Sequence, residues 1–81
     1  MTEISQLIAV ADAYIAASNR KETTVSTSVF NDGKKLTALR SGAVDIGVRR
    51  FNIALEWFSA NWPEGATWPD AVARPSVERA A

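Results

Sequence analysis

The sequence predicts an all-α domain of four helices, followed by a short extended C-terminal tail. Apolar residues recur at helical spacing over most of the first 62 residues, and turn-forming residues interrupt that spacing at three places. All three prolines follow residue 62. We therefore expect one helical domain over residues 1–62 and a Pro/Ala-rich tail over residues 63–81. The chain has 81 residues, 47% of them hydrophobic, which is enough for one small core.

The first helix is expected from about Glu3 to Ser18, with Thr2 as its N-cap. One side of this segment carries apolar residues at i, i+3 and i+4 spacing. They are Ile4, Leu7, Ile8, Ala11, Tyr14 and Ile15. Asn19 closes the helix, because asparagine tolerates the left-handed backbone conformation that often follows a helix C-terminus.

The second helix is expected at about residues 22–30. Glu22 in its first turn favours the positive end of the helix dipole, and Val25 and Val29 give the helix one apolar edge. Its other side is mostly hydroxyl residues, which are poor helix formers, so packing must hold this segment as a helix. The sequence Asn31-Asp32-Gly33 is a strong turn signal and ends it.

A short third helix is expected from Lys34 to Arg40, ending at Ser41-Gly42. Leu36 and Leu39 are its predicted core contacts. The fourth helix is expected from about Ile46 to Asn61, with Asp45 as its N-cap, because Pro63 gives a firm stop after Trp62.

The fourth helix is predicted to have two apolar faces. The core-facing stripe alternates steps of four and three residues and consists of Val44, Val48, Phe51, Leu55, Phe58 and Trp62. The opposite face consists of Ile46, Ile53, Trp57 and Ala60. Either the tail covers this second face, with Trp68 or Val72 against Trp57, or a second subunit does. We favour the subunit, so these four residues are the predicted homodimer interface. The last tail residues, 76–81, are expected to fray.

Composition excludes several classes of function. The chain has no cysteine and no histidine, so disulfides, thiol nucleophiles, histidine bases and the common zinc sites are excluded. Paired carboxylates and Gly-rich phosphate loops are also missing, and we therefore expect no enzyme, metal, cofactor or small-molecule ligand. No apolar run approaches the roughly 20 residues of a membrane span. A cytoplasmic protein without membrane contact is the expectation.

The charges are unevenly distributed although they cancel overall. Nine basic and nine acidic residues give a net charge of zero. Residues 20–50 hold seven of the basic residues and only three of the acidic ones, and the flanks are acidic. A basic central band is expected if one face of the protein meets phosphates. The plain alternative is a mixed, solvated surface.

The segment from Tyr14 to Phe30 reads as helix, tight turn and second helix. Its run Thr23-Thr24-Val25-Ser26 resembles the opening of the recognition helix in the lambda-repressor-like (Cro-like) helix-turn-helix family of small phage and prophage regulators. The stretch from about Ile4 to Trp62 also looks like short prophage-type bacterial proteins. The resemblance implies a four-helix DNA-binding domain that regulates transcription as a repressor or activator.

The resemblance also implies which residues meet double-stranded DNA. In such regulators the recognition helix enters the major groove, and backbone contacts fix its register. Carried over by position, the residues at bases or phosphates are Thr23, Thr24, Ser26 and Thr27. Guanine contacts are expected from Arg20 or Lys21, and phosphate contacts from Lys34, Lys35 and Arg40. The alternative function is a protein-binding module, anti-repressor-like or antitoxin-like, that uses the Trp57 face and the tail.

Overall fold

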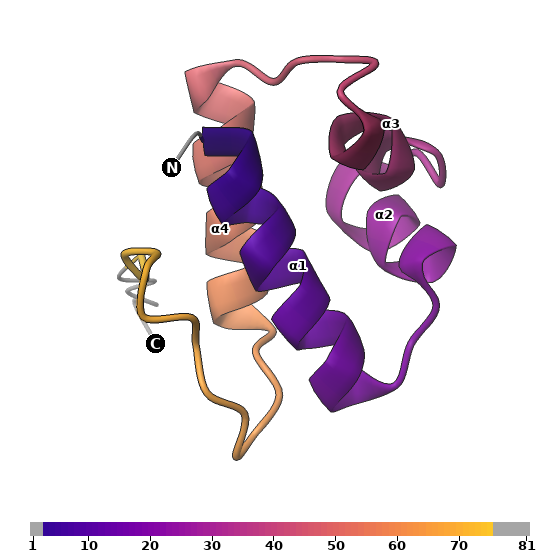
Figure 1. Cartoon of the computed structure of the whole chain (residues 1–81). Coiled ribbons are helices and arrows are strands. Elements are labelled where there is room, and N and C mark those ends of the chain that lie inside the picture. The colour runs from indigo at the N-terminus through magenta and orange to yellow at the C-terminus, as the bar shows by residue number, and fades with distance from the viewer. Residues whose placement is uncertain (1–2, 76–81) are drawn as a thin grey trace.

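The structure of the protein is a computed structural model, which describes residues 3–75 (Figure 1). It holds four helices: α1 (Glu3–Ser18), α2 (Glu22–Phe30), α3 (Lys35–Ser41) and α4 (Val48–Ala60). The described residues contain no strand, which confirms the all-α class for that part of the chain. Across residues 3–75, no helix combines the length and the apolar character that crossing a membrane requires. The expectations for Thr2 and for residues 76–81 lie outside the described residues.

Two layers make up the fold. Helices α1 and α4 lie side by side, and the shorter helices α2 and α3 form a pair on the other side of α1 in the view of Figure 1. A long connection, residues 42–47, crosses from α3 to the start of α4. This connection leaves α3 and α4 out of contact, but α2 and α3 both pack on α1, and α2 also contacts α4.

The first three helices end where the sequence predicts. Asn19 and Asn31 both have φ of 58°, the left-handed conformation, and Gly42 has φ of 81°. The backbone N–H of Asn19 donates to the carbonyl of Ile15 at 2.9 Å, and that of Asn31 donates to the carbonyl of Thr27 at 2.8 Å. Such bonds satisfy the carbonyl groups that a helix end leaves without partners.

The start of α4 differs from the prediction. Asp45 is not the N-cap, because its carboxylate accepts the N–H of the next residue, Ile46, at 2.8 Å, and α4 begins only at Val48. Ile46 is buried before the helix starts, so the chain uses it as a core anchor in an extended segment. The predicted stripe is consequently shorter than expected: Val44 and Val48 are 39% and 63% exposed, whereas Phe51, Leu55 and Phe58 are buried.

The core lies between α1, α4 and the inner sides of α2 and α3. Its members are buried side chains from every helix and from the tail. They are Leu7, Val10, Ala11, Tyr14, Val25, Leu36, Leu39, Ile46, Phe51, Ala54, Leu55, Phe58 and Val72. Tyr14 joins the two long helices, with its ring centroid 5.4 Å from Phe58 and 5.6 Å from Trp57 in edge-on contacts. Edge-on aromatic pairs of this kind stabilise a core beyond the area they bury.

The tail folds back along α4 (Figure 1). Coverage of α4 by the tail was the alternative to the predicted second subunit. Trp68 packs against Trp62 with ring centroids 4.8 Å apart, and Val72 is buried in the core. Arg74 donates to the carbonyl of Ser59 at 2.9 Å and lies over the Trp68 ring at 5.3 Å. The tail thus covers the side of α4 that carries Ser59.

Candidate nucleic-acid interface

Helices α2 and α3 form a unit of two helices joined by one buried hydroxyl, and we call it the α2–α3 unit. The connection is residues 31–34, in which the carboxylate of Asp32 accepts the N–H of Lys34 at 2.9 Å. Ser26, in the middle of α2, is fully buried, and its hydroxyl accepts the N–H of Leu36 at 2.9 Å. The same hydroxyl donates to the carbonyl of Asp32. Because Leu36 lies in the first turn of α3, Ser26 supplies a partner for an N–H that the helix itself cannot satisfy.

Ser26 is therefore not a DNA-reading residue, contrary to the sequence-based expectation. Its side chain is buried, and both of its hydrogen bonds stay within the protein. The helical wheel held a signal for this, because Ser26 lies only about 60° from Val29 at 100° per residue. A serine that close to an apolar edge is poorly placed for solvent or DNA.

The three threonines of α2 are exposed. Thr23, Thr24 and Thr27 lie on the side of α2 away from the core. The hydroxyl of Thr27 donates to the carbonyl of Thr23 at 2.9 Å within the same helix. These side chains form the outer surface of α2, which agrees with the exposure that the predicted DNA contacts need.

Four of the predicted basic contacts surround this unit. Arg20 and Lys21 precede α2 and are exposed, Lys34 is the exposed N-cap residue of α3, and Lys35 is half-buried. None of the four forms an ion pair with another residue of the described part of the chain. Their charges are therefore available to an anionic partner.

Arg40 differs from the other cations because it is held inside the protein's own charge network. Its guanidinium binds Asp12 of α1 and Glu22 of α2, each at 2.7 Å. The hydrogen bond to Asp12 is the main cause that raises the pKa of Arg40 above its usual range. The pKa of Glu22 is lowered, mainly by the hydroxyl of Thr37, which donates to it at 2.6 Å. Arg40 ties α1, α2 and α3 together and is not the free phosphate ligand that the sequence suggested.

The four residues predicted as a dimer interface do not form one surface. Ile46 is a core residue outside α4, and Trp57 is half-buried against Tyr14 and Phe58. Ile53, which is 52% exposed, and Ala60 remain on the outer side of α4. The prediction grouped these residues by applying one helical period from residue 46 to residue 60. The backbone at residue 46 is not helical, so Ile46 does not belong to that face.

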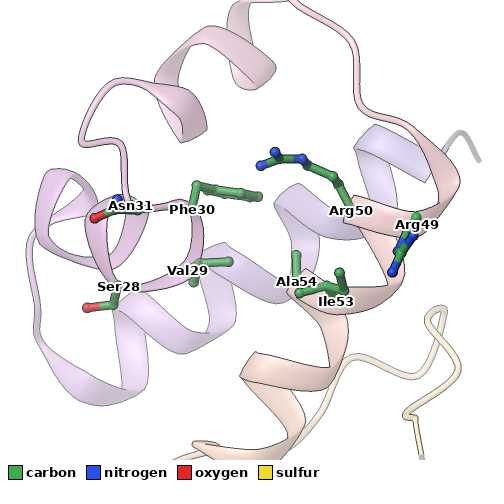
Figure 2. A pocket seen from close by; sticks show the side chains of 8 residues that line it. All are labelled: Ser28, Val29, Phe30, Asn31, Arg49, Arg50, Ile53 and Ala54. Carbon is green, nitrogen blue, oxygen red and sulfur yellow. The ribbon is translucent and has the colours of Figure 1, made fainter.

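A groove separates the C-terminal end of α2 from the N-terminal half of α4 (Figure 2). Its volume is about 440 Å³, and its lining consists of Ser28, Val29, Phe30, Asn31, Arg49, Arg50, Ile53 and Ala54. Arg50 extends toward Phe30 across the gap, whereas Ser28 and Asn31 point away from it (Figure 2). Arg49 and Arg50 were not predicted as site residues. Their place at the end of the basic band of residues 20–50 could have indicated that they belong to a site.

Comparisons with protein-family models, with curated proteins and with solved structures gave no match to this chain.

Proposed function

We propose that this protein binds double-stranded DNA through the α2–α3 unit and regulates transcription. The observation that supports it best is the unit itself: two short helices joined through buried Ser26, with cations next to the start of each helix that form no ion pair among residues 3–75. A helix pair of this kind can place one helix in the major groove while its neighbour contacts the DNA backbone.

The charges around the unit suit a contact with the sugar-phosphate backbone. Arg20 and Lys21 lie beside the N-terminus of α2, where free backbone N–H groups also favour an anion. Lys34 lies at the connection to α3. The phosphate backbone on either side of the major groove of DNA would meet these cations. Such contacts would fix the position of the protein on the DNA without selecting a sequence.

Sequence selection in this proposal falls to the exposed threonines of α2. Thr23, Thr24 and Thr27 offer hydroxyl groups to base edges and methyl groups to thymine. Because hydroxyls discriminate between bases only weakly, we expect modest specificity from one copy of the protein. Glu22 and Arg40 are excluded from the contact set, since each is already bound to the other.

The alternative function, a protein-binding module, loses much of its expected surface. Trp57 packs against Tyr14 and Phe58, and the described tail packs on α4 through Trp68 and Val72. A protein partner would have to bind elsewhere than on the face named from the sequence.

Selection of bound duplexes from a random pool, at two salt concentrations, tests the proposal. We expect an enriched motif whose binding weakens as salt rises, because phosphate contacts release counterions. No enrichment at low salt would contradict DNA binding by this chain.

Two acidic variants then identify the contact helix. Thr24→Glu should lower the affinity for DNA by about 100-fold, because it places a carboxylate against bases or phosphates. The matched control, Thr67→Glu, lies in the exposed part of the tail and should have little effect. If Thr24→Glu binds normally while Lys34→Glu does not, α3 rather than α2 enters the groove.

A further inference from the structure

The outer side of α4 carries a stripe of four exposed side chains, two of which, Arg49 and Ile53, also line the groove toward α2. Arg49, Ile53, Glu56 and Ala60 are all exposed, and their spacing of four, three and four residues places them in one line along the helix; we call them the α4 stripe. Ile53, its centre, is 52% exposed. Side chains that alternate steps of four and three residues form the line along which one helix packs on another.

The charges of the α4 stripe are unpaired within the described residues. Neither Arg49 nor Glu56 forms an ion pair there, although Arg40 in the same protein binds two carboxylates. The two charges lie seven residues apart, too far along one helix to meet each other. Neither charge therefore has an ion-pair partner within residues 3–75.

We propose that a second copy of this chain docks on the α4 stripe, with the two α4 helices antiparallel and a two-fold axis passing beside Ile53. Along the helix axis, Arg49 lies about 6 Å before Ile53 and Glu56 about 4.5 Å after it. An antiparallel partner therefore brings Glu56 of one copy opposite Arg49 of the other, twice in each dimer. The stripe is self-complementary in this arrangement, as an interface with two-fold symmetry requires.

A parallel arrangement is disfavoured by the same charges. It would place Arg49 opposite Arg49 and Glu56 opposite Glu56, and like charges across an interface repel. The antiparallel arrangement is thus selected by charge, and Ile53 at the axis supplies the apolar contact.

Ile53 is one of three large hydrophobic side chains that are exposed within the described residues, the others being Val44 and Val48. The interface would cover Ile53, whereas Val48 lies about 140° from it around α4 at 100° per residue.

This dimer does not depend on DNA binding, and its test needs no DNA. Sedimentation equilibrium of the full chain should give the mass of a dimer that dissociates on dilution. Arg49→Glu and Glu56→Arg should each raise the dissociation constant by about tenfold or more, because each places like charges opposite one another. Both changes lie on exposed side chains, and circular dichroism should show unchanged helix content.

Charge exchange supplies the decisive comparison. The double variant Arg49→Glu/Glu56→Arg restores opposite charges across the axis, and so does an equimolar mixture of the two single variants. Both should recover the dimer, whereas the matched changes Lys21→Glu and Glu64→Arg should leave the mass as in the unchanged protein. A monomeric unchanged protein at all concentrations, or single variants with the same dissociation constant as the unchanged protein, would overturn the proposal. So would a double variant that stays monomeric.

Discussion

Ser26 shows how one hydroxyl can set the geometry of a helix pair. It is buried in α2, accepts the N–H of Leu36 and donates to the carbonyl of Asp32, so it specifies how α3 leaves the turn. An apolar residue of similar size would fill the same space but would leave the N–H of Leu36 buried without a partner. Leaving a buried donor unsatisfied costs more than the bond itself contributes.

We expect Ser26→Ala to lower the free energy of unfolding by about 1–3 kcal/mol, the cost of an unsatisfied buried donor. The measurement is urea denaturation followed by circular dichroism. Ser28→Ala is the matched control, because the hydroxyl of Ser28 is exposed and bonds only to the carbonyl of Thr24 in its own helix. An equal loss of unfolding free energy in both variants would mean that the hydrogen bonds of Ser26 stabilise the protein no more than the bond of Ser28 within its own helix.

At the same scale, the sequence could separate the hydroxyls of α2 only in part. The helical wheel places Ser26 nearer the apolar edge than Thr23 or Thr24, but it places Ser28 equally near, and only the approach of α3 decides that Ser26 is buried and Ser28 exposed. Arg40 was misassigned for a related reason, since its partners Asp12 and Glu22 are 28 and 18 residues away along the chain. Contacts between residues that far apart leave no local pattern.

The helices as elements were largely predictable, because each depends on signals close to its ends. Apolar spacing together with Asn19, Asn31 and Gly42 gave the ends of α1, α2 and α3. The start of α4 was not predictable in this way. Asp45 offers a plausible cap, but burial of Ile46 in the core holds the backbone extended for two more residues. A tertiary contact overrode the local signal there.

The contribution of the tail to the stability of the domain can be measured with one substitution, Trp68→Ala. We expect Trp68→Ala to lower the free energy of unfolding by about 2–3 kcal/mol, less than a fully buried aromatic would, because Trp68 is only partly buried. The change removes the contact with Trp62, the hydrogen bond to the carbonyl of Val72 at 2.8 Å and the contact with Arg74. Far-ultraviolet circular dichroism during urea denaturation avoids the altered fluorescence of the variant.

Thr67→Ala, one residue earlier and exposed, serves as the control and should be nearly neutral. If Trp68→Ala were equally neutral, the folded-back tail would not contribute to the stability of the domain in solution.

For the molecule as a whole, a net charge of zero conceals two kinds of cation. Arg40 is neutralised by two carboxylates of its own chain, whereas Arg20, Lys21, Lys34 and Lys35 have no ion-pair partner among residues 3–75. If the protein binds DNA as proposed, only the second kind can displace the counterions that are condensed on the DNA phosphates. The salt dependence of binding should therefore follow the unpaired cations, and the formal net charge of the chain should not predict it.

The salt dependence of DNA affinity in two variants tests this distinction. Lys34→Gln should reduce the slope of log affinity against log salt by about 0.9, the value for one lost phosphate contact. Arg40→Gln should leave the slope unchanged, even if freeing Asp12 and Glu22 weakens binding by repulsion, because no counterion release is lost with it. A fall of the same size with Arg40→Gln would show that Arg40 leaves its carboxylates for a phosphate in the complex. The charge network between α1, α2 and α3 would then rearrange when DNA binds.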